Sequence, residues 1–102
     1  MQARVVLVTH PVQGAREFAR KLVERGVAAC CNLTEVRSVY RWQGGVEDEP
    51  EALLVIKTSV DRLAQLEEVL AADHPYDVPE LVALEPTHVA PDYLTWLLGE
   101  VS

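Results

Sequence analysis

The sequence contains no apolar run that approaches the roughly 20 residues needed to cross a bilayer. Residues 1–4 lead directly into a strand pattern, and they lack the longer apolar stretch and the small-residue cleavage site of a secretory signal. We therefore expect a cytoplasmic protein that does not engage membranes.

Basic side chains are scarce. Nine Lys and Arg stand against sixteen Asp and Glu, which gives a net charge of −7. Affinity for a phosphate backbone comes from Lys and Arg that displace counterions, so this balance argues against nucleic-acid binding. The acidic excess weakly attracts cations but does not predict a metal site, because most carboxylates are simply solvated.

Only two cysteines occur, and they are adjacent, at Cys30 and Cys31. Neighbouring residues in a strand point to opposite faces, so a disulfide between them would be strained and would close no loop. The pair is therefore not a disulfide framework, in agreement with a reducing compartment. The absence of a CxxC motif also disfavours a copper chaperone of that type.

Three strand-like runs are apolar on both faces, at residues 5–8, 53–56 and 81–84. A strand that faces water on one side alternates apolar and polar residues. These runs do not alternate, so both sides of their sheet must be covered. The chain has too few helices for both sides, and we expect further copies of the protein to supply the second cover.

Helical spacing of apolar residues appears twice. The first helix begins near Ala15 and ends at Gly26, because glycine readily accepts the left-handed conformation of a helix cap. The second is capped by Asp61 and ended by His74, because a residue before proline leaves helical geometry. Pro91 opens a short last helix.

Four strands separate these helices. We expect them at about residues 3–9, 27–43, 51–58 and 80–85, with an irregularity near Thr34-Glu35 and a hairpin turn at Gly44-Gly45. The order predicts one α+β domain over residues 1–102, a ferredoxin-like βαββαβ sandwich with a short C-terminal helix. Right-handed crossovers place both main helices on one side of the sheet. The other side would be an apolar patch larger than soluble monomers tolerate, which predicts an obligate homo-oligomer.

Five local strings follow one another along the chain, at residues 28–32, 38–44, 57–58, 74–80 and 93–97. Together they closely resemble the CutA family of divalent-cation tolerance proteins over nearly the whole chain. The resemblance implies a tight trimer similar to that of PII-type signalling proteins. It also implies a role in copper or general divalent-metal tolerance, with no established catalytic activity.

His74 and Cys30 are the candidate metal ligands. Histidine is a common ligand, although His74 could equally cap helical carbonyls or pack against Tyr76. Cys30 lies in one of the family strings and could bind a soft ion such as Cu(I), with core packing of both cysteines as the alternative. Pro75 and Pro79 would hold the intervening loop extended, which can aim His74 and Glu80 into one cleft or serve simple loop packing. Copper or another divalent cation is the only cofactor predicted.

A ligand cleft between subunits is implied by the PII-like arrangement. The polar residues expected near it, besides His74, are Tyr40, Lys57, Tyr76 and Glu80. Lys57 and Glu80 could instead form an ion pair across strands. Tyr40 and Trp42 share a strand face just before the turn, and a long two-stranded arm is marginal alone, so we expect both rings at the trimer interface.

The remaining charged groups are expected to be solvated. His10 and His88 fall in predicted loops. The acidic residues at 47–49 and 51 lack the order of a calcium-binding loop, and a solvated cluster that protects a sheet edge is the simpler interpretation.

The function predicted from these features is that of a small homotrimeric binding protein, not an enzyme. It would bind a metal ion or a small ligand in clefts between subunits. Two alternatives remain open: an acylphosphatase-like enzyme using Asn32, and a purely structural or partner-docking trimer. No glycine-rich phosphate loop follows the first strand, and no Ser/His/Asp set stands at a useful spacing.

Overall fold

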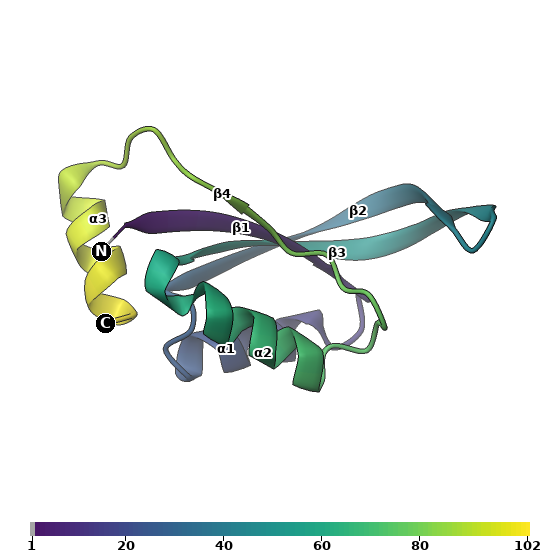
Figure 1. Cartoon of the computed structure of the whole chain (residues 1–102), viewed down its shortest axis with the longest axis horizontal. Coiled ribbons are helices and arrows are strands. Elements are labelled where there is room, and N and C mark those ends of the chain that lie inside the picture. The colour runs from purple at the N-terminus through teal and green to yellow at the C-terminus, as the bar shows by residue number, and fades with distance from the viewer. Residues whose placement is uncertain (1) are drawn as a thin grey trace.

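The computed structural model describes residues 2–102 and has the predicted βαββαβ order with a further C-terminal helix (Figure 1). The helices are α1 (Ala15–Glu24), α2 (Leu63–Asp73) and α3 (Pro91–Glu100), and a single 3-10 turn, η1 (Val60–Arg62), leads into α2. The strands are β1 (Ala3–His10), β2 (Cys30–Trp42), β3 (Gly45–Ser59) and β4 (Val82–Leu84).

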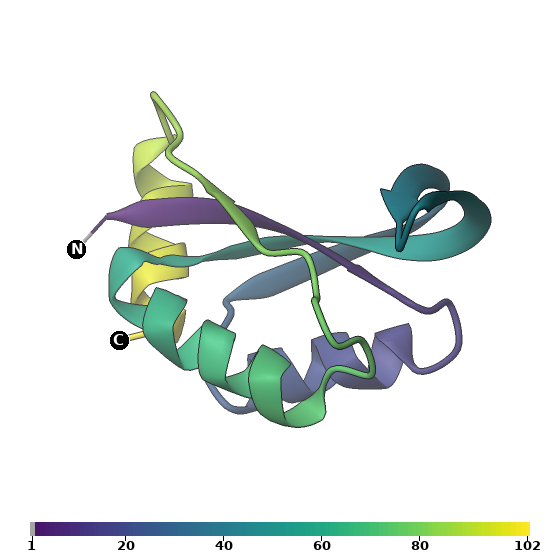
Figure 2. The same cartoon turned by 45° about the vertical axis from the view of Figure 1, so that its right-hand side comes forward.

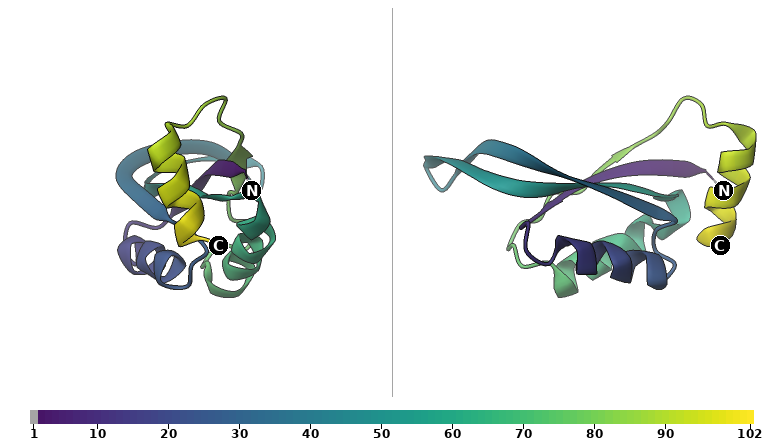
Figure 3. Two further views of the ribbon diagram at one scale, coloured as in Figure 1. Left: turned by 90° about the vertical axis from the view of Figure 1, so that its left-hand side faces the viewer. Right: turned by 180° about the vertical axis from the view of Figure 1, so that it is seen from behind.

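The four strands form one antiparallel sheet in the order β2-β3-β1-β4. Figures 1 and 3 show α1 and α2 side by side against one face of this sheet. Helix α3 stands at the end where β1 begins, and its Leu97 packs with Ala3, Ala29 and Val101. The ferredoxin-like architecture and the position of the two main helices, α1 and α2, on one side of the sheet are thus confirmed.

The main core lies between the sheet and the two helices. Val6 and Val8 of β1 are fully buried there, beside Leu54 and Ile56 of β3, and α1 adds Leu22. Residues directly opposite in an antiparallel ladder share a face of the sheet. Val6, Val8, Leu54 and Ile56 therefore face the helices. The residues that alternate with them along the same strands point to the opposite face of the sheet.

That other set forms the bare face, which we define as the sheet surface opposite α1 and α2. It carries the half-buried or exposed apolar residues Val5, Leu7, Leu53, Val55, Val82 and Leu84. Val82 and Leu84 are each 46% exposed. Strands that are apolar on both faces, with the two main helices α1 and α2 on only one, are confirmed as the central feature of this chain.

Beyond the C-terminal end of β1, strands β2 and β3 continue as a two-stranded hairpin arm, residues 36–42 and 45–51. Pairing with β1 stops at Ala52 on β3, whereas β2 and β3 pair without interruption from Cys30↔Lys57 to Trp42↔Gly45. The predicted irregularity at Thr34-Glu35 is wrong, because both residues keep this register. Figure 2 shows the arm curling away from the rest of the sheet.

The hairpin turn lies one residue earlier than predicted, at Gln43-Gly44. Both residues have positive φ, 50° and 82°, as a two-residue turn that matches the strand twist requires. The prediction of Gly44-Gly45 assumes that glycine occupies both positions, but Gln43 takes the first. Strand β3 begins directly after this turn, at Gly45 instead of near residue 51, so the acidic residues belong to a strand.

The helix ends follow local chemistry with one exception. Gly26, at φ 72°, donates its N–H to the Val23 carbonyl oxygen, and Val27 donates to that of Leu22, which is the Schellman pattern that ends α1. His74 is extended at the end of α2, as predicted. Asp61 is not a helix cap, because it lies inside η1 and the described caps of η1 and α2 use no side chain.

The last strand is shorter than the six residues predicted. Only Val82–Leu84 pairs with β1, opposite residues 5–7, and Pro86 soon follows without an N–H to donate. Within residues 2–102, none of the helices has both the length and the apolar character that a bilayer crossing requires.

Candidate functional site

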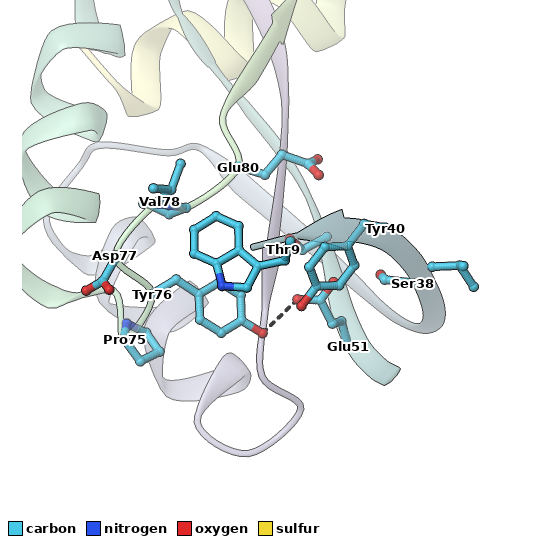
Figure 4. A pocket seen from close by; sticks show the side chains of 12 residues that line it. Thr9, Ser38, Tyr40, Glu51, Pro75, Tyr76, Asp77, Val78 and Glu80 are labelled. Carbon is cyan, nitrogen blue, oxygen red and sulfur yellow. Dashed lines mark hydrogen bonds between the residues drawn. The ribbon is translucent and has the colours of Figure 1, made fainter. Parts of the chain in front are cut away.

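A pocket of about 700 Å³ lies between the hairpin arm and the loop of residues 75–80, which leads from α2 back to the sheet edge (Figure 4). The arm contributes Ser38, Val39, Tyr40, Trp42 and Glu51, β1 contributes Thr9, and the loop contributes all six of its residues. The volume falls in the range of pockets that hold small molecules.

A hydrogen bond between Tyr76 and Glu51 joins the loop to the base of the arm. The Tyr76 hydroxyl donates to Glu51 Oε2 at 2.7 Å, shown as a dashed line in Figure 4. Glu51 is only 4% exposed, so this bond provides a hydrogen-bond donor to a carboxylate that is largely shielded from solvent. Burial, followed by the hydrogen bond to Glu51, raises the pKa of Tyr76 above its ordinary value.

The second phenol of the pocket makes a similar bond on the arm. Tyr40 lies opposite Glu47 in the ladder and its hydroxyl donates to Glu49 Oε1. This hydrogen bond is the main cause that raises the pKa of Tyr40 to about 12. Both phenols are therefore neutral at physiological pH, and both donate their protons to carboxylates.

Negative charge dominates the pocket. Glu51, Asp77 and Glu80 all line it, and the described lining residues include no lysine, arginine or histidine. Burial and then the charge of Glu51 raise the pKa of Glu80. Extending the β1–β4 register by two residues places Glu80 opposite Thr9, which explains how a carboxylate from the edge segment comes to face the pocket.

His74 connects the loop of residues 75–80 to strand β1 through two hydrogen bonds of its ring. Its Nε2 lies 2.8 Å from the Thr9 carbonyl oxygen, and its Nδ1 accepts the Tyr76 N–H at 3.1 Å. The proton must then be on Nε2, where it meets a β1 carbonyl beyond the last residue that pairs with β4. Burial lowers the pKa of His74, which is 8% exposed, so the neutral ring is favoured.

His10 is buried as well, and the prediction of a solvated loop residue is wrong. Strand β1 extends to His10, whose side chain is 5% exposed and follows Val6 and Val8 on the helix-facing side. Its ring centroid lies 5.0 Å from those of Phe18 and His74. The alternation of β1, carried two residues beyond Val8, is the signal that would have found it. His88 is exposed, as predicted.

Cys30 and Lys57 lie elsewhere, directly opposite each other on the bare face. Both contact Asn32: Lys57 Nζ donates to Asn32 Oδ1, and the Cys30 thiol lies 3.8 Å from the same oxygen. The alternative prediction is an ion pair between Lys57 and Glu80 across strands. The described residues form no such pair. Asn32 is thereby engaged on the sheet surface.

The two predicted metal ligands are not brought together in one protomer. Cys30 points to the bare face, whereas the His74 ring packs with His10 and Phe18 on the helix side. Among residues 2–102 no three His, Cys, Asp or Glu side chains converge closely enough to hold a metal ion. Cys31 packs against the core, and burial raises the pKa of its thiol to about 12.

Three of the four residues predicted for the ligand cleft, Tyr40, Tyr76 and Glu80, do line one pocket, and Trp42 joins them. Sequence reasoning misses Glu51, because it groups this residue with the solvated acids. The signal that could have found it is its register. It lies two residues from Leu53 on the same strand face, so it has to meet whatever covers that face.

The relatives of this chain agree with this architecture. The family model of the CutA1 divalent ion tolerance proteins matches residues 4–100. The divalent-cation tolerance protein CutA of Thermus thermophilus is 45% identical over 95 residues, which are 91% of this chain and 92% of that protein.

Two solved structures superpose closely. The divalent cation tolerance protein of Thermus thermophilus has a TM-score of 0.94 at 42% identity, covering 99% of this chain and 100% of its own. The PII-like protein CutA from Nostoc has a TM-score of 0.92 at 33% identity, covering 97% of each chain. This chain therefore belongs to the CutA1 family of divalent ion tolerance proteins.

Proposed function

We propose that this chain is a cytoplasmic, homotrimeric binding protein that acts in divalent-cation tolerance without catalysing a reaction. Its ligand site is the pocket between the hairpin arm and the loop of residues 75–80. The observation that carries the proposal is the position of this pocket, because its aromatic wall belongs to the same arm that we expect a second copy to cover.

The apolar surface supports assembly. Val82 and Leu84 of the bare face are 46% exposed, and Val39 and Val46 on the arm are each 65% exposed. Removing such surface from water favours association, although the loss of translational and rotational freedom offsets part of the gain. An arm of two strands gains little stability by itself, so packing on a neighbouring copy would give it a fixed position.

Ligand binding and assembly would then meet at Tyr40 and Trp42. Both rings line the pocket and remain 36% and 41% exposed in the single protomer. Lys57 lies on the bare face and does not line the pocket of its own protomer. A neighbouring copy would then complete a pocket whose described walls all come from one protomer.

Copper binding through Cys30 and His74 stays a prediction. The geometry favours the pocket over that pair, because the two side chains lie on opposite sides of the sheet and both ring nitrogens of His74 are already engaged. We therefore propose that the chain contributes to tolerance through the pocket ligand and not through a thiol–imidazole copper centre.

Light scattering and equilibrium dialysis test this function. We expect a mass three times that of the 11.3 kDa chain. We also expect Cu(I), Cu(II) and Zn(II) retention to be the same for wild type, Cys30→Ser and His74→Ala. A mass of one chain at micromolar concentration would contradict the trimer, and retention lost in either variant would restore the copper centre.

The enzymatic alternative has its own measurement. An acylphosphatase would hydrolyse acetyl phosphate and lose that activity in Asn32→Ala. We expect no turnover above the uncatalysed rate with either protein, because the Asn32 amide oxygen is engaged by Lys57 on the sheet face.

A further inference from the structure

We infer that the pocket between the arm and the loop takes an organic cation, an alkylammonium or guanidinium group, in preference to an anion or a bare metal ion. This inference rests on the proposed function, which places a ligand there. It adds the chemical class of that ligand, argued from charge, wall chemistry and size.

The charge of the pocket lacks a counterpart within the described residues. Glu51, Asp77 and Glu80 line it, and the basic side chains described elsewhere in the protomer do not. Glu51 is 4% exposed, and the only hydrogen bond that the described residues give its carboxylate goes to Oε2. Glu80 is exposed at the pocket rim, and its pKa is raised by partial desolvation and then by the charge of Glu51. A cation would relieve this crowding of negative groups, whereas an anion would add to it.

The walls of the pocket are suited to a cation that carries carbon. Tyr40, Trp42 and Tyr76 supply three aromatic rings, from the arm and from the facing loop. The face of an aromatic ring attracts ammonium and guanidinium groups, with tryptophan the strongest of the three rings. Aromatic rings combined with carboxylates are therefore selective for organic cations.

A bare metal ion suits the pocket less well. No three potential ligands among the described residues converge on one point. The phenol protons of Tyr40 and Tyr76 already occupy oxygens of Glu49 and Glu51. A space of about 700 Å³ also exceeds by far what one ion fills, whereas it suits a small organic molecule.

Two sources could supply this chemistry. One is a free small molecule. The other is a lysine of a neighbouring copy, for which Lys57 is the candidate because it lies on the bare face with Asn32 as its hydrogen-bond partner.

Calorimetric titration with two matched probes tests the inference. Choline and 3,3-dimethylbutan-1-ol have nearly the same shape, but only choline is charged. We expect choline to bind the assembled wild-type protein about tenfold more tightly than the alcohol. Glu80→Gln and Glu51→Gln should each weaken choline binding about fivefold. Glu85→Gln removes the same charge from an exposed residue outside the pocket and should have no effect.

The Lys57→Met variant separates the two sources, with Lys21→Met on α1 as its control. Binding of choline only after Lys57 is removed would support the inference and identify the cation as a lysine of the protein. Equal affinity of wild type for both probes would overturn it, as would a failure of choline to bind both wild type and Lys57→Met. The mass of the same samples is measured by light scattering. A trimeric mass would leave the proposed assembly intact even if the binding result overturns the inference. A mass of one chain would contradict the assembly and would not bear on the ligand class.

Discussion

The hydroxyl of Tyr76 and the carboxylate of Glu51 form a 2.7 Å hydrogen bond that joins the loop after α2 to the base of the hairpin arm. The two residues are 25 positions apart in the sequence. They come from opposite walls of the pocket, so this bond helps to set the distance between the loop and the arm.

Removing the hydroxyl should cost stability. In Tyr76→Phe the Glu51 carboxylate stays buried but loses its donor, and we expect the free energy of unfolding to fall by about 1–3 kcal/mol. Urea denaturation followed by circular dichroism measures this change. Tyr40→Phe is the control, because its partner Glu49 is more exposed and water can replace the lost hydroxyl. Equal losses in the two variants would show that the Tyr76 bond has no special role.

Acidification should loosen the loop. The pKa of His74 is lowered in the folded protein, chiefly by burial, from an ordinary value of 6.5. The unfolded chain then binds a proton more readily, so the contribution of His74 is complete above pH 6.5 and is lost as the pH falls towards the folded-state pKa. Unfolding free energies measured between about pH 5 and 8, the range in which histidine titrates, should show this loss.

The matched variants separate His74 from the other groups. His74→Gln should flatten the pH dependence, because an amide does not titrate. His88→Gln alters an exposed histidine and should leave the slope unchanged. An unchanged slope in His74→Gln would contradict the assignment of this pH dependence to His74.

The bare face should not tolerate charge. In Leu84→Asp a carboxylate would enter the proposed contact between copies without a partner, at a cost of about 3–5 kcal/mol for each unpaired charge. We expect this variant to lose mass in light scattering or to fail to assemble. Val12→Asp changes a residue of similar exposure, 42%, in the turn before α1 and should keep the wild-type mass. Two variants with the same mass would place the contact elsewhere.

Two glycines should respond oppositely to alanine. Gly26 has φ 72°, and the described residues leave room for an added methyl group, so Gly26→Ala introduces only backbone strain of about 1 kcal/mol. Gly99 has similar room but lies within α3, where alanine is favoured over glycine by about 1 kcal/mol. Thermal denaturation of both variants checks the signs, and destabilisation by Gly99→Ala would contradict the helical assignment of its backbone.

Sequence periodicity is sufficient for the architecture, because residues 5–8 and 53–56 have no polar face to give to water. That feature predicts the one-sided helices and the bare face. Periodicity cannot place the hairpin turn, since Gln43 takes a positive φ that its residue type does not favour. Nor does periodicity reveal that the acidic residues 47–49 continue the ladder as part of β3, because a run of charges has no apolar alternation.

The pocket is only partly predictable for a related reason. Tyr40, Tyr76 and Glu80 emerge from the family strings, whereas the role of Glu51 depends on a long-range contact. His74 stands out in the sequence, but its partners are a β1 carbonyl and a loop amide, which no local pattern reveals. Lys57 lies further along the sheet and does not line the pocket of its own protomer.

The fluorescence of Trp42 reports whether another copy of the chain covers the arm that bears the pocket. Trp96→Phe leaves Trp42 as the only tryptophan. At micromolar concentration we expect the blue-shifted emission of a buried indole, moving to the red when Leu84→Asp is added. Emission typical of a solvent-exposed indole, unaffected by Leu84→Asp, would contradict coverage of the arm by a neighbouring copy.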